Sequence, residues 1–309
     1  MLLRVGTRSS KLSIAQTTLV IERLLVKHPS LAFEKSLIVT QGDLDKNTPL
    51  FKMDLKGIFE KEVNQAVLDG RVDFAVHSMK DIPAYDEDTG LVIAGVLERG
   101  SPADVIVSRN NEKLEELKPG STIGTSSLLR VAQLKRVRPD LRIEPIRGNV
   151  ETRILKVEKG DYDSVILAEA GLKRLGLEQK ITQRLALKDF LPAPGQGIIS
   201  PVTKKSSKEI TRILESVEDS QTRAEGEAER ELVRVLEGGC KVPIGAYATG
   251  DGGRLNLTAC VLSADGKTRL EASATDKTTQ ATSLGGRVAL DLLDQGAKSL
   301  EETWRSTLV

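Results

Sequence analysis

Aromatic side chains are scarce in this chain of 309 residues, where Phe, Trp and Tyr together make up 3%. Proteins that hold single-stranded nucleic acid stack bases on aromatic rings, so this composition argues against that class. The formal net charge is +1, which gives no overall field to attract nucleic acid or an anionic membrane. No apolar run approaches the roughly 20 residues needed to span a bilayer.

Cysteine and histidine are also rare, with two residues of each. Two cysteines, Cys240 and Cys260, cannot build the disulfide scaffold of a small secreted protein. The first residues show no basic region followed by an apolar run, so a signal peptide is not expected. The sequence contains no His/Cys/Asp cluster with metal-ligand spacing. We therefore expect a cytoplasmic protein without a metal site.

Short apolar segments alternate with helical patterns over about the first 200 residues. Strands are predicted at 2–5, 36–40, 74–77, 91–97, 105–108, 122–124, 141–146 and 164–168, and helices at 10–28, 59–68, 126–138 and 149–159. This alternation predicts an α/β fold of two lobes with largely parallel sheets. Ligands bind at the carboxyl ends of strands in such sheets, where the polar segments 77–83, 124–127 and 147–149 lie.

The composition changes after about residue 203. A polar linker is predicted at 204–208 and a strongly charged helix at 218–236. The apolar stripe of this helix consists of Ala224, Ala228, Leu232 and Leu236. A strand at 255–262 followed by an Ala-Asp-Gly turn predicts a hairpin, and a final helix is predicted over 281–306. Residues 218–309 are therefore expected to form a small α+β domain.

The first candidate site is the polar segment that follows the apolar strand at 74–77. Ser78, Lys80 and Asp81 place a hydroxyl, an ammonium and a carboxylate at the strand's tip, where they are suited to acid–base work. The alternative is a polar loop in which Asp81 caps a turn. Position alone favours that plainer interpretation.

The second candidate is the link between a strand and a helix at residues 124–130. Free backbone N–H groups, the hydroxyls of Thr125, Ser126 and Ser127, and Arg130 together resemble an anion-binding site. A plain capped helix start is the competing interpretation. The motif by itself fits a phosphate as well as a carboxylate.

Basic residues are in local excess between residues 121 and 160, with nine Lys or Arg against four Asp or Glu. The arginines in or near this stretch are Arg130, Arg136, Arg138, Arg142, Arg147, Arg153 and Arg174. Arginine suits bidentate binding of carboxylates and phosphates, although those near the end of the helix are expected on a solvated surface. Nucleic acid is the functional rival. Tyr162 is the single aromatic residue between residues 104 and 189, so a polyanionic small molecule fits better.

Cys240 follows Gly238 and Gly239, which leave its sulfur unshielded, and Lys241 can favour the thiolate. Cys260 lies in an alternating strand and is expected to be a small core residue. A Cys–His hydrolase would require His77 to reach Cys240, because no histidine is adjacent in the sequence.

Together, and in this order, these segments resemble the hydroxymethylbilane synthase (porphobilinogen deaminase) family. The matching segments are 4–10, 42–43, 56–62, 73–83, 124–128, 147–153, 168–176, 192–197 and 236–245. Each segment alone is a weak signal, but nine collinear ones are highly specific. Beyond residue 245 only the general pattern agrees.

The resemblance implies a transferase of porphyrin and haem biosynthesis. Such an enzyme joins four porphobilinogen molecules head to tail, releases ammonia at each step, and hydrolyses the product to free the linear tetrapyrrole hydroxymethylbilane. The chain grows on a dipyrromethane cofactor, which a thioether attaches to Cys240. Each ring carries an acetate and a propionate, which gives the local arginine excess a purpose. The activity implied by the resemblance requires no subunit interface, so we expect a monomer.

The resemblance also implies residue roles. Asp81 would help to protonate the departing amine, stabilise the developing azafulvenium cation and assist deprotonation of the new linkage. Cofactor contacts are expected from Asp43, Ser78, Lys80, Thr125, Ser127, Arg130 and Arg147. Substrate contacts are expected from Arg8, Ser10, Gln16, Lys52, Lys56, Arg153, Arg174 and Gln196.

The fold implied by the resemblance is two periplasmic-binding-protein-like α/β lobes plus the C-terminal α+β domain. The first lobe would comprise residues 1–97 and 196–215, the second 102–192, and the C-terminal domain 218–309, which carries the cofactor cysteine. Sequence periodicity does not show the return of the chain to the first lobe, so that part rests on the resemblance.

One position departs from the family pattern. The family usually has two arginines after the segment 124–128, whereas this chain has Leu129 and Arg130. A buried carboxylate that loses its partner costs about 1–3 kcal/mol. Either a neighbour such as Lys135 substitutes, or the cofactor is assembled or retained poorly. We expect the fold to survive and cofactor loading or turnover to be the vulnerable step.

The alternative hypothesis is a non-catalytic anion-binding protein with the same two lobes. It needs an open cleft and arginines, but neither Asp81 nor Cys240.

Overall fold

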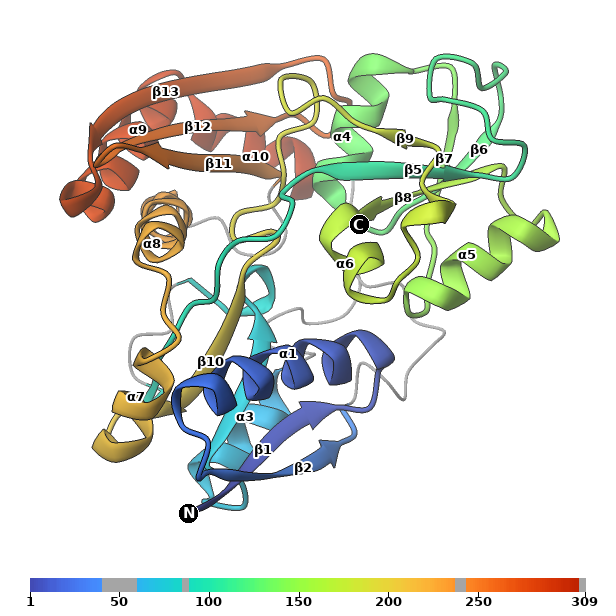
Figure 1. Ribbon diagram of the computed structural model, residues 1–309. Coiled ribbons are helices and arrows are strands. Elements are labelled where there is room, and N and C mark those ends of the chain that lie inside the picture. Colours follow the sequence, from blue (N-terminus) through green and yellow to red (C-terminus); the bar gives the residue numbers. More distant parts are fainter. Residues whose placement is uncertain (41–59, 85–88, 237–242, 306–309) are drawn as a thin grey trace.

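The computed structural model describes residues 1–40, 60–84, 89–236 and 243–305. Within these residues the chain forms three bodies, each built on its own β-sheet (Figure 1). Two α/β bodies with five-stranded sheets are the first and second lobes, and a three-stranded antiparallel sheet with helices is the C-terminal domain. The predicted fold class, two α/β lobes plus a small α+β domain, is confirmed.

The first lobe has the strand order β2-β1-β3-β10-β4. Its strands are β1 (Leu2–Arg8), β2 (Ala32–Ile38), β3 (Phe74–Ser78), β4 (Leu91–Ile93) and β10 (Ile199–Lys204). Its helices are α1 (Lys11–Lys27), α3 (Lys61–Leu68), α7 (Lys208–Glu215) and the 3-10 turn η2 (Met79–Asp81). Successive side chains of β3 point to opposite faces of the sheet, and helices cover both of these faces. Phe74 and Val76 are buried in the same cluster as residues of α1 and α7, and Ala75 is buried with residues of α3.

The second lobe has the strand order β7-β6-β8-β5-β9. Its strands are β5 (Asp104–Ser108), β6 (Thr122–Gly124), β7 (Arg142–Glu144), β8 (Ser164–Ala168) and β9 (Gln183–Arg184). Its helices are α4 (Leu128–Val137), α5 (Val150–Lys159), α6 (Glu169–Arg174) and the 3-10 turn η3 (Glu178–Lys180). The same alternation operates here, because Ile106 packs with Leu134 of α4, whereas Val107 packs with Val157 of α5.

The sheet of each lobe contains both parallel and antiparallel strand pairs. The prediction of largely parallel sheets is therefore wrong for the antiparallel strands. β1 is parallel to β2 and β3, and β6 is parallel to β7 and β8. By contrast, β10 is antiparallel to β3 and β4, and β5 is antiparallel to β8 and β9. These antiparallel strands are the ones by which the chain enters the second lobe and returns to the first. Periodicity indicates that a strand is buried but not in which direction it runs.

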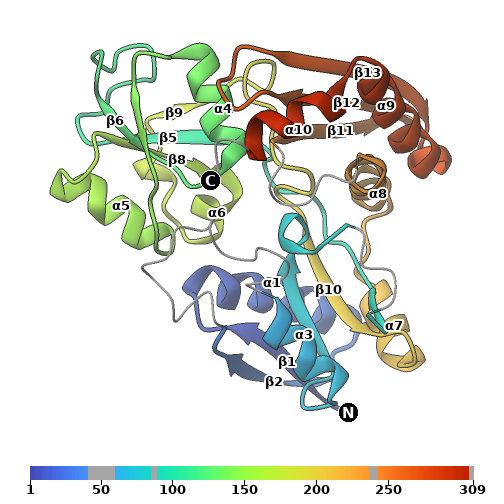
Figure 2. The ribbon, with the colours of Figure 1, turned by 180° about the vertical axis from the view of Figure 1, so that it is seen from behind.

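Two crossover segments, residues 94–103 and 185–198, connect the lobes. They run alongside each other in the front and back views (Figures 1 and 2). The Leu97 N–H donates to the Ile199 carbonyl, and the Gly100 N–H donates to the Gly197 carbonyl, both at 3.1 Å. The lobes are therefore joined by two lengths of chain that are hydrogen-bonded to each other.

The C-terminal domain packs three helices against an antiparallel sheet. Its elements are α8 (Ser220–Val235), β11 (Ile244–Asp251), β12 (Arg254–Leu262), β13 (Arg269–Lys277), the 3-10 turn η4 (Thr278–Gln280), α9 (Ala281–Asp294) and α10 (Ala297–Arg305). The predicted stripe of α8 and the hairpin after β12 are confirmed. The single helix predicted over 281–306 is wrong. Gly296 has a φ of 95°, which interrupts the helix between α9 and α10.

An apolar cluster joins the C-terminal domain to the second lobe. Leu129 and Ala132 of α4 pack there with Cys260 and Leu262 of β12 and with Trp304 of α10. The indole N–H of Trp304 donates to the Leu262 carbonyl at 2.9 Å. Burial raises the pKa of the Cys260 thiol to about 11. The prediction that Cys260 is a small core residue is confirmed.

Other predicted boundaries differ by a few residues. β2 spans Ala32–Ile38 rather than 36–40, because its pairing with β1 begins at Leu2 and Ala32. β4 ends at Ile93, since the chain then leaves as the first crossover segment. The predicted linker at 204–208 contains the end of β10 and the start of α7. Phe59, the predicted start of α3, lies outside the described residues.

Candidate functional site

A cavity of about 510 Å³ lies between the two lobes. Its walls come from the carboxyl ends of β1, β3 and β8 and from the starts of α1 and α5. The wall brings together ten of the predicted site residues: Arg8, Ser10, Gln16, Ser78, Lys80, Asp81, Arg130, Arg147, Arg153 and Arg174. This is the edge at which the βα alternation predicts a ligand.

Asp81 lies at the end of the 3-10 turn η2, on the first-lobe wall. The Met79 N–H donates to the Ile198 carbonyl, and the Ile82 N–H closes the turn on the Met79 carbonyl, both at 3.0 Å. Met79 is buried, whereas Asp81 is exposed. The turn thus anchors its apolar side chain in the protein and presents its carboxylate to the cavity.

The second crossover segment touches this turn at Gly195. The residue has a φ of 76°, and a Cβ atom there would lie 2.9 Å from the backbone nitrogen of Lys80. Only glycine fits such a close approach with this backbone conformation. The turn of Asp81 is therefore fixed against the segment that connects the lobes.

Polar side chains on the first-lobe wall are held by one another. The Ser10 hydroxyl accepts from the Ser13 N–H at 3.2 Å and so caps α1, as predicted. The side-chain amide of Gln16 donates to the Ser78 hydroxyl at 2.8 Å. These contacts fix the positions of Ser10, Gln16 and Ser78 on the wall.

His77 lies on β3, lines the same cavity and is largely buried. Its Nε2 atom is 3.0 Å from Oδ1 of Asn64. Burial and, to a lesser degree, the charge of Arg8 lower the pKa of His77 to about 4. The imidazole is therefore neutral at neutral pH and already engaged with Asn64, which does not support a Cys–His hydrolase.

Acid should destabilise a His77→Gln variant less than the wild-type protein. The pKa of His77 is 6.5 when unperturbed and about 4 in the folded protein. Between these values the unfolded state binds more protons, so stability falls as the pH falls from 6.5 toward 4. At pH 4.5 this linkage should remove about 2 kcal/mol from the free energy of unfolding. Denaturant titrations at pH 7.5 and 4.5 measure it, with His28→Gln as the control. Equal pH dependence in wild type and His77→Gln would contradict the prediction.

Arg153 and Arg174 present cations to the cavity from the second lobe. Arg153 Nε donates to the Gly148 carbonyl at 2.8 Å, and Arg174 donates to the Gly197 carbonyl. Burial lowers the pKa of both to about 10, and the charges of Arg130 and Arg147 also lower that of Arg153. Across the described residues neither guanidinium has an acidic partner. Partly desolvated cations without counterions favour an anionic ligand.

A network of hydrogen bonds connects Lys80 to the second lobe. Lys80 Nζ donates to Oε1 of Gln196 at 3.1 Å, and Nε2 of Gln196 donates to Oδ1 of Asp104 at 2.7 Å. Asp104 also accepts from Nε and Nη2 of Arg130, at 2.9 and 2.7 Å. The Lys80 side chain is exposed to the cavity. Desolvation by the surrounding walls lowers its pKa, and the charge of Arg130 lowers it further. Arg130 thus lies on the wall but is paired with Asp104.

Three predicted site residues lie beside the cavity rather than on its wall: Thr125, Ser127 and Gln196. The Ser127 hydroxyl accepts from the Arg130 N–H at 3.4 Å and caps α4, and the Thr125 hydroxyl accepts from the Ser127 N–H at 3.2 Å. The capped helix start therefore accounts for these hydroxyls. Asp43, Lys52, Lys56 and Cys240 lie outside the described residues.

Leu129 is directed away from the cavity, into the apolar cluster between α4 and the C-terminal domain. Lys135 does not take the place of an arginine on the described wall, because its Nζ atom donates to the Ala264 carbonyl at 3.1 Å. In this structure an arginine at position 129 would bury a guanidinium among apolar side chains. The expectation of poor cofactor loading stays a prediction.

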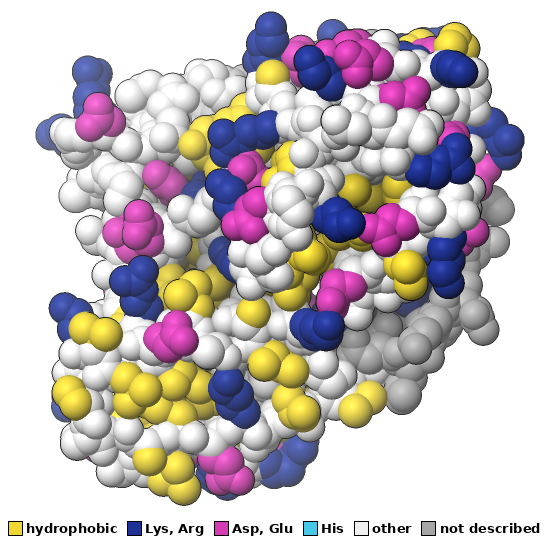
Figure 3. Space-filling view, turned by 45° about the vertical axis from the view of Figure 1, so that its right-hand side comes forward, with side chains coloured by type: hydrophobic (Ala, Val, Ile, Leu, Met, Phe, Trp, Pro, Cys, Tyr) yellow, Lys and Arg dark blue, Asp and Glu magenta, His cyan; other side chains and the backbone are white. Residues whose placement is uncertain are grey.

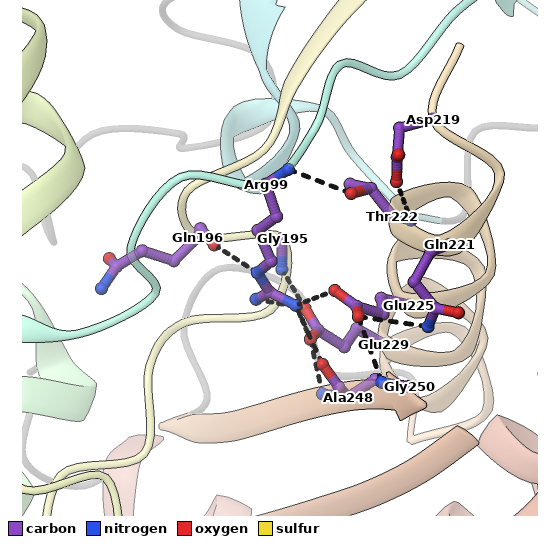
Figure 4. A network of polar contacts seen from close by, with 10 residues as sticks. All are labelled: Arg99, Gly195, Gln196, Asp219, Gln221, Thr222, Glu225, Glu229, Ala248 and Gly250. Carbon is purple, nitrogen blue, oxygen red and sulfur yellow. Dashed lines mark hydrogen bonds and ion pairs between the residues drawn. The ribbon is translucent and has the colours of Figure 1, made fainter. Parts of the chain in front are cut away.

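Sequence reasoning missed a second polar network (Figure 4). Arg99, on the first crossover segment, donates to Glu229 of α8 at 2.6 Å and to the Gln196 carbonyl at 3.0 Å. Glu229 is fully buried and also accepts the N–H groups of Gly195, at 2.6 Å, and Ala248, at 2.7 Å. One carboxylate therefore ties both crossover segments to the C-terminal domain.

The surroundings of Arg99 keep it charged. Burial alone would lower its pKa, but Glu229 raises it, and Glu225 lies 3.5 Å away. The guanidinium also stacks 5.1 Å from the ring centre of Tyr247. Burial raises the pKa of Glu225, an effect that the charge of Arg99 opposes.

Known proteins resemble the chain over nearly its whole length. Residues 3–212 match the family model described as porphobilinogen deaminase, dipyromethane cofactor binding domain, and residues 224–294 match that of the porphobilinogen deaminase C-terminal domain. This chain belongs to the porphobilinogen deaminase family. A probable porphobilinogen deaminase of Nitrosopumilus maritimus is 45% identical over 301 residues, covering 97% of this chain and 96% of that protein. The porphobilinogen deaminase of Bacillus subtilis is 43% identical over 300 residues, covering 96% and 95%.

Among solved structures, the VFT2 domain of Bordetella pertussis BvgS has a TM-score of 0.43 and 17% identity, covering 70% of this chain and 86% of that chain. The periplasmic aliphatic sulphonate binding protein SsuA of Escherichia coli has a TM-score of 0.41 and 15% identity, covering 76% and 70%. The strand orders and the family match confirm two α/β lobes with an added C-terminal domain.

The cavity of this porphobilinogen deaminase family member fits a dipyrromethane group. Such a group carries carboxylate side chains, and the wall supplies guanidinium groups, among them Arg153 and Arg174, that no acidic side chain pairs within the described residues. In the part of the chain that the structure describes, no helix has the length and apolarity to cross a membrane.

Proposed function

We propose that this chain is a hydroxymethylbilane synthase. It joins four porphobilinogen molecules head to tail on a covalent dipyrromethane group, releases ammonia at each step, and frees the linear tetrapyrrole by hydrolysis. The observation that carries the proposal is the position of Asp81, an exposed carboxylate among the cationic side chains of the cavity wall, in a member of the porphobilinogen deaminase family.

Asp81 would serve the reaction in three ways. Its carboxylate would assist proton delivery to the departing amine and stabilise the positive charge that develops on the substrate as ammonia leaves. It would also accept the proton released when the new linkage forms. Glu60, the other acidic residue on the described wall, is buried, so Asp81 is the carboxylate available to the substrate.

The cations of the wall would bind the acetate and propionate groups of substrate and growing chain. Arg153 and Arg174 would do so from the second lobe, and Arg8 from the first. When bound, the dipyrromethane group supplies the pyrrole ring to which the first substrate unit is joined. Cys240 would hold this group through a thioether. The family match to a dipyromethane cofactor binding domain supports the assignment of the group itself.

We further propose that residues 1–97 and 196–215 form the first domain, 102–192 the second, and 218–309 the C-terminal domain that carries Cys240. The position of β10 in the first-lobe sheet supports this division. The protein would act as a cytoplasmic monomer, with neither nucleic acid nor membrane as a partner. Basic and acidic side chains are interspersed on the face shown in Figure 3, which supports a small-molecule substrate over nucleic acid.

The intact mass of the purified protein tests this function. We expect a covalent increment equal to a dipyrrole, absent from Cys240→Ser and retained in Cys260→Ala, because Cys260 is buried in the core. Wild-type protein should also consume porphobilinogen. An unmodified wild-type mass together with tight binding of a different anion would favour the non-catalytic alternative.

A further inference from the structure

Helix α8 contacts the loop of Asp81 on the side away from the substrate cavity. Arg230 of α8 donates from Nη1 to the Ile82 carbonyl at 2.9 Å and from Nη2 to the Pro83 carbonyl at 2.8 Å. These carbonyls belong to the two residues that directly follow Asp81. Arg230 therefore holds the outgoing end of the turn.

Gly226 holds the incoming end. A Cβ atom on Gly226 would lie 2.6 Å from Sδ of Met79, so α8 packs directly against the first residue of the turn. Residues four apart in a helix lie on the same face, which places Gly226 and Arg230 one above the other. One face of α8 thus contacts the turn both before and after Asp81.

Within the described residues, no carboxylate forms an ion pair with Arg230. Its neighbours Arg223 and Arg234 pair with Glu218 and Glu231. Within the described residues Arg230 has no such acidic partner, and burial and the charge of Arg223 lower its pKa to about 10. A partly buried guanidinium without a counterion is costly, and the hydrogen bonds to the Ile82 and Pro83 carbonyls offset part of that cost.

Packing between α8 and the turn is also incomplete. A second cavity of about 280 Å³ lies there, lined by Met79, Ala84 and Arg230 among others. Arg230 bridges this space to reach the two carbonyls. Without it, the loop after Asp81 would lose its described polar contact with α8.

We propose that Arg230 is a positioning residue that fixes the Asp81 carboxylate relative to the arginines of the substrate cavity. The inference rests on the proposed function, in which Asp81 performs the chemistry. Arg230 lines the second cavity and not the substrate cavity, so it acts on the rate of the reaction rather than on substrate binding.

Steady-state kinetics of the cofactor-loaded enzyme test the proposal. Arg230→Gln should lower kcat by about 10- to 100-fold, because a small misplacement of a reacting group has effects of that size, and should leave KM for porphobilinogen within about twofold. Arg230→Lys, which keeps one donor group, should recover part of the loss. In an Asp81→Asn background, Arg230→Gln should cause little additional loss in single-turnover rate. Arg287→Gln is the control, because it removes an exposed arginine of the same domain that pairs with Asp276.

Hydrogen exchange gives a readout that does not depend on activity. The peptide covering residues 79–84 should exchange faster in Arg230→Gln than in wild type and Arg287→Gln, since the Ile82 N–H closes the turn. Wild-type kcat in Arg230→Gln, or unchanged exchange in this peptide, would overturn the inference. If the wild-type protein does not consume porphobilinogen, the proposed function fails, and the exchange result still decides whether Arg230 holds the turn.

Discussion

An Asp81→Asn variant should fold normally and lose turnover by roughly 10³-fold or more, because it removes both a proton-transfer group and a charge that stabilises the developing cation. Asparagine has nearly the same shape as aspartate, and position 81 is exposed, so the anchoring of the turn through Met79 should persist. Porphobilinogen consumption measures the loss, and circular dichroism and thermal unfolding check the fold.

The matched control is Asp69→Asn, which removes a carboxylate from the surface of the same lobe. Asp69 pairs with Arg71 at 3.4 Å, and both side chains are exposed, so activity should stay at the wild-type level. Near-normal turnover in Asp81→Asn would remove Asp81 as the catalytic carboxylate. The arginines of the wall would then have to be reconsidered as the machinery of a binding protein.

The largest effect on stability is expected from Glu229→Gln. Glu229 accepts hydrogen bonds from Arg99 and from two backbone N–H groups while fully buried, and Arg99 is also buried. The substitution removes the negative charge that balances the buried guanidinium of Arg99. It also places an amide N–H₂ group opposite N–H donors, where only an acceptor can form a hydrogen bond. Breaking one partner of a buried pair costs about 3–5 kcal/mol. The free energy of unfolding from denaturant titration should fall by about this amount.

Glu158→Gln is the control, because Glu158 and its partner Lys180 are both exposed and lie 2.7 Å apart. Exposed pairs contribute about 0–1 kcal/mol, so this variant should remain close to wild type. A loss below about 1 kcal/mol in Glu229→Gln would show that the crossover segments do not depend on this carboxylate.

Much of the fold follows from local patterns. The apolar run at 164–168 is strand β8 without adjustment, and Asn149 begins α5 with its side chain accepting from the Thr152 N–H at 2.9 Å. Patterns of this kind depend on neighbours in the sequence. The placement of β10 does not, because its partner in the sheet, β3, lies more than 100 residues earlier in the chain. The family resemblance, and not periodicity, predicted that return.

The site shows the same limit. Ser78, Lys80 and Asp81 could be named as a candidate site because they follow a buried strand, where polar groups meet a ligand. Position alone favoured a plain polar loop, and the role of Asp81 came from the family resemblance. Asp104 offered a weaker signal, as a carboxylate directly before the apolar run of β5. Glu229 gave no signal in the sequence, because a glutamate on a highly charged helix is normally exposed. Its burial depends on Arg99, which lies 130 residues away in the chain.

The paired crossover segments have a mechanical consequence. A body attached through two neighbouring connections rotates most easily about the line that passes through them, and points far from that line move most. Gln196 belongs to the second crossover segment, and Lys80 donates to it. The starts of α1 and α5 lie away from these segments (Figure 1), where an exposed Lys11–Glu151 pair at 2.6 Å spans the lobes. Rotation would break this exposed pair, separate α1 from α6 and widen the rim. The distance between Lys80 and its partners would hardly change, so every addition could occur in the same geometry while the lengthening product occupies the rim.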